Sequence, residues 1–386
     1  MNRNFDVIVL GVGGMGSAAC FELARRGKRV LGLEQFPLVH SQGSSHGHTR
    51  IIRTAYAEHP GYVPLVRRAF ERWYELEQLT GRHLLTECPC LNVGPPNCEH
   101  VEGVRASVRE HKLAAEELSA SEITKRFPAF RFPADYVGIL EQDAGFLLVE
   151  ECVRAHIDSA VSLGAEVHGE EPVQEWKAVG DGVTVTTTKG TYHAAKLVIT
   201  AGAWATRLLA DLGVRLTVMR QTLLWFGVGS RAAEFRRDRF PLFIGETPHS
   251  MFYGFPAIDS SGMKIARHYS APELPNPDGV DWNIVDADVA SMRPLLDEYI
   301  PGIGAFTKGQ VCMYTVSPDR HFVIDVHPAH PQVSVACGFS GHGFKFASAV
   351  GEVLADLAET GTTRHGIGMF SATRFGNAER GVRNAE

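Results

Sequence analysis

The first thirty-four residues contain two mostly apolar runs separated by a glycine-rich turn and a helical pattern. Residues 5–10 predict a buried strand, residues 14–26 predict a helix that ends at Gly27, and residues 29–34 predict a second strand. Strand, helix and strand in this order form a βαβ unit, which is typical of α/β folds. We therefore expect the chain to open with a nucleotide-binding domain.

Later apolar patterns predict the remaining main elements. Apolar residues at helical spacing predict an amphipathic helix that continues to about Leu79. Residues 181–199 alternate and predict a hairpin with its turn at Lys189 and Gly190, which runs into a buried strand before the small residues 201–204. Short aromatic strands are expected between residues 240 and 265, and a last helix from about residue 345 to residue 357.

The order of these patterns predicts two interleaved domains. A chain of 386 residues exceeds what one hydrophobic core normally organises. Nucleotide-type segments occur at the start, middle and end of the chain, and strand-rich segments lie between them. We expect residues 1–84, 150–217 and 318–386 to form a cofactor-binding domain, and residues 85–149 and 218–317 to form a substrate domain.

The glycine-rich turn has the spacing of a dinucleotide site. Gly11, Gly13 and Gly16 form G-x-G-x-x-G, with an additional Gly14, and such glycines allow the backbone to approach a pyrophosphate at a helix amino end. Glu34, 18 residues after Gly16, is placed to hydrogen-bond ribose hydroxyls, and its charge disfavours the additional phosphate of NADP. The motif alone leaves FAD and NAD open.

Charge and cysteine content exclude several classes of protein. The chain has 44 acidic and 38 basic residues without a long basic run, so a nucleic-acid partner is not expected. No apolar span reaches membrane-crossing length, and the amino terminus lacks the pattern of a signal peptide. Seven scattered cysteines do not form a disulfide framework and favour a cytoplasmic location. Cys88, Cys90 and Cys98 lack the spacing of a metal motif, and no metal is expected.

Six longer segments resemble one enzyme family. They are GSSHGHTRIIR, YVPLVRRA, FYGFPA, GMKIARH, CMYTVSPDRHFVID and GFSGHGFKFAS. Through them, and over essentially its whole length, the chain resembles the monomeric sarcosine oxidase and N-methyl-L-tryptophan oxidase family of FAD-dependent amine oxidases. The resemblance implies a monomer with an FAD-binding Rossmann-like domain of the glutathione-reductase-like, D-amino-acid-oxidase-like type. It also implies an interleaved substrate domain on a mixed, antiparallel-rich sheet.

The resemblance implies how the flavin is held and reoxidised. Cys312, in the segment Val-Cys-Met-Tyr, matches the cysteine that carries FAD through a covalent 8α-S-cysteinyl bond. Lys264 matches the lysine that lies over the flavin and speeds its reaction with oxygen. A buried ammonium stabilises the superoxide that forms when oxygen accepts its first electron, which gives this assignment a physical basis.

Other matched residues imply a substrate site and a cofactor site. Arg53 and Lys345 match the cations that bind the substrate carboxylate, while Arg50, His268 and Tyr253 match residues near the flavin and the substrate amine, and Tyr314 matches a further substrate contact. The residues implied to contact FAD are Gly11, Gly13, Gly14, Met15, Gly16, Glu34, Gln35, Ser44, His46, Arg50, Ile51, Val173, Gly202, Trp204, Cys312, Met313, Phe339, Gly341, His342, Gly343, Phe344 and Lys345.

The expected reaction is oxidation of a secondary amine amino acid such as sarcosine, with oxygen as electron acceptor. The products would be formaldehyde, the primary amino acid and hydrogen peroxide. The alternatives are the same chemistry on N-methyltryptophan, pipecolate or another bulky or cyclic amine, a dehydrogenase with a different electron acceptor, and an FAD-binding protein without activity. Ser45 and His48 depart from the family pattern, in which a histidine and an aspartate stand, so substrate preference and rate stay open.

Overall fold

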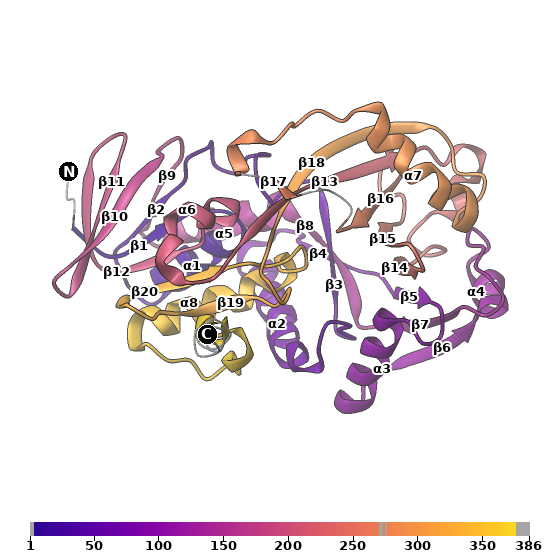
Figure 1. The fold of residues 1–386 in the computed structure, drawn as a ribbon, viewed down its shortest axis with the longest axis horizontal. Coiled ribbons are helices and arrows are strands. Elements are labelled where there is room, and N and C mark those ends of the chain that lie inside the picture. The colour runs from indigo at the N-terminus through magenta and orange to yellow at the C-terminus, as the bar shows by residue number, and fades with distance from the viewer. Residues whose placement is uncertain (1–3, 270–272, 275, 376–386) are drawn as a thin grey trace, which may run out of the picture.

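The computed structural model describes residues 4–269, 273–274 and 276–375. In this part of the chain the strands form three sheets, of eight, nine and three strands. The two large sheets lie at opposite ends of an elongated molecule (Figure 1). The mixed α/β fold class expected from the sequence is confirmed.

The eight-stranded sheet is built around the amino-terminal strand. Its strands are β1 (Asn4–Leu10), β2 (Val30–Leu33), β9 (Glu166–His168), β10 (Val173–Val179), β11 (Gly182–Thr187), β12 (Thr191–Ile199), β19 (Val323–His327) and β20 (His330–Cys337). β1 pairs in parallel with β2 and β12, β2 with β9, and β12 with β20. β10, β11 and β19 add antiparallel pairs. The predicted βαβ unit and hairpin are confirmed, although the second strand is shorter than expected.

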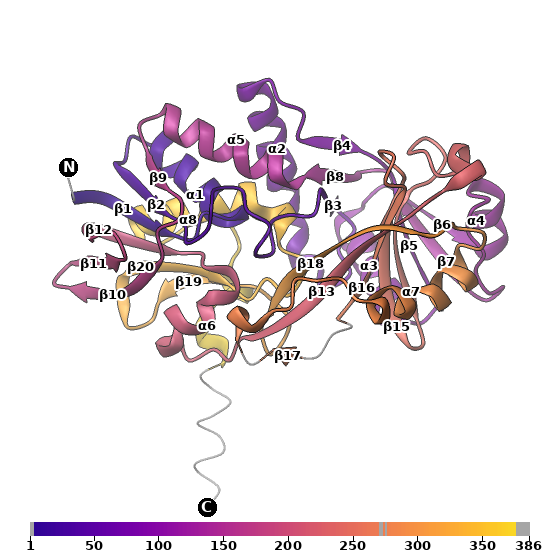
Figure 2. The same cartoon turned by 90° about the horizontal axis from the view of Figure 1, so that it is seen from above.

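The helices that pack around this sheet are α1 (Gly14–Arg25), α2 (Val63–Thr80), α5 (Val149–Ser162), α6 (Ala205–Leu208) and α8 (Ala347–Thr360). α1 contacts both α5 and α8, as Figure 2 also shows. Small residues permit this close packing, since a Cβ on Gly351 of α8 would lie 2.7 Å from the Ala18 backbone of α1. The last helix begins at Ala347, later than predicted. Phe344–Phe346 form a separate 3-10 turn, in which the Lys345 carbonyl accepts the Trp73 indole N–H at 2.9 Å.

The nine-stranded sheet is mixed and mostly antiparallel, as predicted. Its strands are β5 (Cys90–Gly94), β6 (Ala115–Ser119), β7 (Val137–Glu141), β13 (Thr217–Phe226), β14 (Leu242–Thr247), β15 (Ser250–Phe255), β16 (Met263–His268), β17 (Glu273–Leu274) and β18 (Phe306–Val316). Only β5 and β14 pair in parallel among the described strands of this sheet. The accompanying helices are α3 (Glu99–His111), α4 (Ala120–Arg126) and α7 (Asp286–Tyr299).

The two faces of this sheet have different roles because successive side chains of a strand point in opposite directions. On β16, Met263 and Ile265 pack into an apolar core with residues of α7, including Leu296. Lys264 and His268 alternate with them and therefore lie on the opposite face. Cross-strand pairing places Tyr253 of β15 and Cys312 of β18 on this second face as well. One face thus builds the core, and the other carries polar and reactive side chains.

A small third sheet joins the two ends of the molecule. It contains β3 (Thr49–Arg53), β8 (Ala144–Leu148) and β4 (Leu85–Glu87), in the order β3-β8-β4. Figures 1 and 2 show these strands between the two large sheets. β3 carries Arg50 and Arg53. Segments from both ends of the chain contribute strands to the eight-stranded sheet. The residue boundaries expected for the two domains stay a prediction.

Candidate active site

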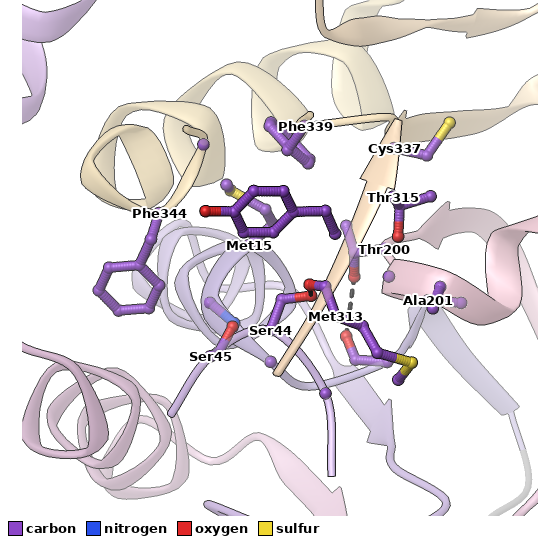
Figure 3. Close-up of a pocket in the computed structure, with 18 of the residues that line it drawn as sticks. Met15, Ser44, Ser45, Thr200, Ala201, Met313, Thr315, Cys337, Phe339 and Phe344 are labelled. Atoms are coloured by element: carbon purple, nitrogen blue, oxygen red, sulfur yellow. Dashed lines mark hydrogen bonds between the residues drawn. The ribbon is translucent and has the colours of Figure 1, made fainter. Parts of the chain in front are cut away.

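A cavity of about 530 Å³ extends from the turn between β1 and α1 to Arg53 and Lys345. Figure 3 shows part of its wall, where Met15, Ser44 and Ser45 lie near Met313 and Phe344 although the sequence separates these groups widely. All of the predicted site residues line this cavity except Gly16, His46, Lys264 and Cys312. A single cavity therefore joins the predicted cofactor and substrate residues.

The turn at one end of the cavity depends on glycine. Gly11 has φ +83°, a region that other residues rarely adopt, and a Cβ on Gly16 would overlap the Gly11 carbonyl oxygen. The Glu34 carboxylate accepts the backbone N–H of Val12 at 2.9 Å. At the start of α1, the Ser45 hydroxyl accepts the Gly14 N–H at 3.0 Å. Ser45 therefore contacts the helix terminus on which a phosphate is expected to bind.

Two buried cations mark the other end of the cavity. Arg53 is 3% exposed, and its guanidinium donates to the Ala55 carbonyl at 2.6 Å and to the Glu58 carboxylate at 3.0 Å. Lys345 is 6% exposed, and its ammonium donates to the His342 carbonyl at 2.7 Å. Ionic groups in a low-dielectric site interact strongly. This end is therefore suited to bind an anion.

The ionisation of these groups is coupled. Burial lowers the pKa of Lys345 to about 7, and Arg53 adds to this effect while Glu58 opposes it. Burial alone would raise the pKa of Glu58, but Arg53, His342 and Lys345 hold it well below its usual value. Burial also lowers the pKa of His342 to about 4, so this ring is neutral near pH 7. Glu58 is thus a carboxylate, whereas Lys345 titrates near neutrality.

Lys264 and Cys312 lie behind the cavity wall. The Lys264 ammonium donates to the carbonyls of Gly47 at 2.7 Å and Thr49 at 2.8 Å, and to the Thr49 hydroxyl at 3.1 Å. Burial lowers the pKa of Lys264, but three acceptors match the three N–H groups of an ammonium. Burial raises the pKa of the Cys312 thiol, and the positive charges of Arg50 and Lys264 oppose this rise.

Two tyrosines and a histidine form another part of the cavity wall. The Tyr314 hydroxyl lies 3.1 Å from Nδ1 of His268 and 3.5 Å from the Tyr253 hydroxyl. Burial lowers the pKa of His268 to about 3, so its ring is neutral at physiological pH. This wall offers aromatic surface and uncharged hydrogen-bonding groups. Such a surface suits the uncharged form of an amine.

The structure accounts for one departure from the family pattern. His48 has φ +72°, and its side chain is partly exposed, with Nδ1 3.5 Å from the Asp259 carboxylate. Glu150 accepts the backbone N–H of Gly47 at 2.7 Å and of His48 at 3.2 Å. Its pKa is lowered, because these and other hydrogen bonds outweigh the effect of burial. A carboxylate therefore still lies beside this loop and its Arg50 side chain, although it is Glu150 of α5 and not a residue at position 48.

Sequence reasoning missed Glu58 and His100, which both line the cavity. Glu58 stands five residues after Arg53, and that short spacing is the only signal that could have indicated it. His100 lies in α3, where a single histidine carries no motif. Each was missed because its place in the cavity wall depends on tertiary packing.

A second group of possible metal ligands lies away from this cavity. Ligand atoms of Asp211, His327 and His330 are all within 4.8 Å of one another. Nδ1 of His327 accepts the Ala329 N–H at 3.2 Å, which places the proton of a neutral ring on Nε2, the atom 3.4 Å from Asp211. Nε2 nevertheless makes no hydrogen bond of good geometry with a described residue, so the contact between His327 and Asp211 is mainly electrostatic.

The fold and the cavity define a flavin-dependent oxidoreductase. The chain belongs to the family of FAD-dependent oxidoreductases, which it matches over residues 6–357. It is 46% identical to a monomeric sarcosine oxidase of Streptomyces avermitilis over 98% of this chain and 100% of that protein. It is 36% identical to an N-methyl-L-tryptophan oxidase of Salmonella agona over 96% of this chain and 99% of that protein. The resemblance found in the sequence is confirmed.

A solved structure shows the same fold. The open form of NikD, described as an unusual amino acid oxidase essential for nikkomycin biosynthesis, has a TM-score of 0.84 and 25% sequence identity. The match covers 96% of this chain and 98% of NikD. Among the residues that the structure describes, no helix combines the length and apolar character needed to cross a membrane.

The residues around the cavity fit FAD. The βαβ turn has the glycines that close backbone approach requires, and α1 begins at the cavity wall. In another part of the wall, Gly341 and Gly343 have no room for a side chain, since a Cβ on Gly343 would lie 2.5 Å from the Phe339 ring. A cavity of this volume lies in the usual range for cofactor and ligand sites.

Proposed function

We propose that this protein is an oxidase of secondary amine amino acids, which removes the N-methyl group of sarcosine or a related N-methyl amino acid. The observation that carries the proposal is the pair of buried cations, Arg53 and Lys345, at the end of a cavity whose other end fits FAD. When bound, FAD accepts two electrons from the substrate and passes them to oxygen. The products would be formaldehyde, the primary amino acid and hydrogen peroxide.

Arg53 and Lys345 would bind the substrate carboxylate. A guanidinium offers two parallel N–H donors to a carboxylate, and an ammonium adds a point charge. The pair would fix the substrate so that its N-methyl carbon faces the flavin, because positioning of this kind contributes strongly to rate. Glu58 already neutralises part of this charge, which supports binding of a substrate with one carboxylate.

Tyr253, Tyr314 and His268 would surround the substrate amine. A secondary ammonium must lose a proton before its N-methyl carbon is oxidised. The neutral ring of His268 and the absence of a carboxylate from this trio favour the uncharged amine over the ammonium. Arg50, which donates to the carbonyls of Ser44 at 2.8 Å and Thr49 at 2.9 Å, would hold the loop beside the flavin.

Cys312 and Lys264 would act on the flavin side. Cys312 would hold FAD through an 8α-S-cysteinyl bond, to which it would contribute the sulfur atom. Arg50 and Lys264 stabilise the thiolate that formation of this bond needs. Lys264 would speed the reaction with oxygen through its positive charge.

The remaining predicted contacts would hold the rest of FAD. The turn from Gly11 to Gly16 would bind the pyrophosphate, and Glu34 would bind the adenosine ribose. The loop that contains Gly341, His342, Gly343 and Phe344 would lie against the flavin ring. The protein would be a monomer in the cytoplasm. The location is supported by the seven cysteines, none of which forms a disulfide in the described structure.

Steady-state peroxide formation with sarcosine, N-methyltryptophan, pipecolate and proline tests the proposal. We expect activity with sarcosine or another N-methyl amino acid, and none with the corresponding N-methyl amide, which lacks the carboxylate. Absence of activity with every secondary amine would refute the proposal. Rapid flavin reduction without peroxide formation would instead favour the dehydrogenase alternative. Highest activity with N-methyltryptophan or pipecolate would favour the alternative of a bulky or cyclic substrate.

A further inference from the structure

A buried carboxylate holds the turn that follows Arg53. Glu141, the last residue of β7, is 1% exposed. Its Oε2 atom accepts the backbone N–H of Thr54 at 3.0 Å and of Ala55 at 2.7 Å, and the Thr54 hydroxyl at 3.2 Å. Burial raises the pKa of Glu141, but Arg53 and these donors oppose the rise. An environment made of donors favours an ionised, accepting carboxylate.

The second oxygen of Glu141 begins a chain of hydrogen bonds toward the cavity. Oε1 accepts the side-chain N–H of Asn92 at 3.1 Å, and Oδ1 of Asn92 lies 3.0 Å from Nε2 of His100. Asn92 and His100 are both buried, and His100 lines the cavity. The chain therefore connects a fixed negative charge to a residue of the cavity wall.

The direction of each hydrogen bond follows from the first. An ionised carboxylate only accepts, so Asn92 must turn its NH₂ group toward Glu141 and its oxygen toward His100. His100 must then donate from Nε2. Burial lowers the pKa of His100 to about 3, so the ring is neutral and its Nδ1 atom keeps an accepting lone pair. Among the described residues, none donates a hydrogen bond to this Nδ1 atom.

We propose that His100 determines specificity, because Glu141, acting through Asn92, holds its ring with Nδ1 as an acceptor for an N–H or O–H group of the substrate. The proposal rests on the function proposed above for the cavity. His100 lines the same cavity as Arg53 and Glu58, the residues beside which the substrate carboxylate would bind. There it would meet a substituent on the α-carbon of the substrate. A side chain with a donor is favoured, and a second carboxylate is disfavoured.

Two substrates of equal shape test this contact. N-methylserine carries a hydroxyl where N-methyl-2-aminobutyrate carries a methyl group. We expect kcat/KM to favour N-methylserine by about tenfold, since a site that accepts a hydrogen bond discriminates against a substrate without the donor. In His100→Phe the ratio should fall to within about twofold. An unchanged ratio in His100→Phe would overturn the proposal.

Nitrogen-15 NMR of histidine-labelled holoenzyme tests the roles of Glu141 and Asn92. We expect His100 to carry its proton on Nε2 in the native protein. In Glu141→Gln, the introduced side-chain NH₂ would face Asn92, so Asn92 should turn its oxygen toward it and its own NH₂ group toward His100. Asn92 then donates to Nε2 of His100, and the proton of the His100 ring moves to Nδ1. Asn92→Leu should remove the preference for Nε2, and it provides a second variant should His100→Phe not fold. A proton on Nδ1 of the native protein, or an unchanged tautomer in Glu141→Gln, would overturn the proposal.

The NMR measurement also separates this inference from the proposed function. If the protein oxidises no secondary amine, the proposed function fails. The same two amino acids can then be added as ligands. A shift of the His100 Nδ1 signal with N-methylserine but not with N-methyl-2-aminobutyrate would still support the contact, and equal shifts with both would overturn it.

Discussion

The Lys345 ammonium and the Arg53 guanidinium face the same aromatic ring, that of Tyr56, at 5.2 Å and 4.6 Å from its centroid. An aromatic face attracts cations and offers them no acceptor that would compete with a bound anion. The two positive charges therefore stay close together without complete neutralisation. Their mutual repulsion contributes to the low pKa of Lys345, after the larger effect of burial.

Carboxylate binding should therefore depend on pH near neutrality. Lys345 has a pKa of about 7 in the free protein, so its positive charge is present below pH 7 and is lost above it. A bound carboxylate stabilises the charged form, which means that binding takes up a proton above pH 7. We expect the Kd of acetate, measured from the visible spectrum of the flavin, to rise up to about tenfold per pH unit above pH 7.

Matched variants of Lys345 separate this effect from other titrations. Lys345→Met should bind acetate weakly with little pH dependence, and Lys345→Arg should bind it with a flat profile because arginine stays charged. A pH profile in Lys345→Met that equals that of the native protein would assign the titration to another group.

Arg53 should affect substrate binding more than any other residue of the cavity. Arg53→Met removes a buried charge and leaves Glu58 without its 3.0 Å partner, a change that typically costs roughly 3–5 kcal/mol. We expect KM for sarcosine to rise at least about a hundredfold and the melting temperature to fall. The double variant Arg53→Met with Glu58→Gln should regain part of the stability but not the low KM. Recovery of both would contradict a role in binding the carboxylate.

The sequence predicted the parts of the fold that local patterns encode. The βαβ unit, the hairpin at residues 182–199 and the amphipathic helix α2 each combine a clear apolar period with a turn signal. The parallel pairing of β5 with β14 joins segments that lie about 150 residues apart, and no local pattern encodes it. No local pattern encodes the small sheet either, which places β3 between the two large sheets.

The candidate site was predicted only where residues matched a family motif. Arg53 and Lys345 have such motifs, and the structure brings them to one cavity. Glu58 and Glu141 have none, and an isolated glutamate is normally expected on the surface. Glu141 is buried and Glu58 is half-buried, and both accept hydrogen bonds formed across the fold, from Arg53 and from the backbone of residues 54 and 55. Such partners become visible only in three dimensions.

Lys264 should control the reaction with oxygen and not the reaction with substrate. In Lys264→Met we expect the rate of flavin reoxidation to fall at least about a hundredfold, because the charge that stabilises superoxide is lost. The rate of flavin reduction should change less than about threefold. Stopped-flow measurement of the two half-reactions distinguishes these effects.

Lys308 provides a matched control for Lys264. It lies beside the same ring of Trp225, at 5.0 Å from its centroid compared with 5.3 Å for Lys264, but its side chain is exposed to solvent. Water screens such a charge, so Lys308→Met should change the reoxidation rate less than about twofold. Equal losses in the two variants would mean that the general positive field, and not Lys264 itself, speeds the reaction.

Cys312 should keep the flavin bound after denaturation. Acid precipitation of the native protein should leave the yellow colour in the pellet, whereas Cys312→Ser should release it into the supernatant. Cys337 is the matched control, because it is equally buried and lines the cavity, yet it lies on β20 in the eight-stranded sheet. Cys337→Ser should therefore retain the flavin. Release of flavin from the native protein, or from Cys337→Ser alone, would contradict a bond at Cys312.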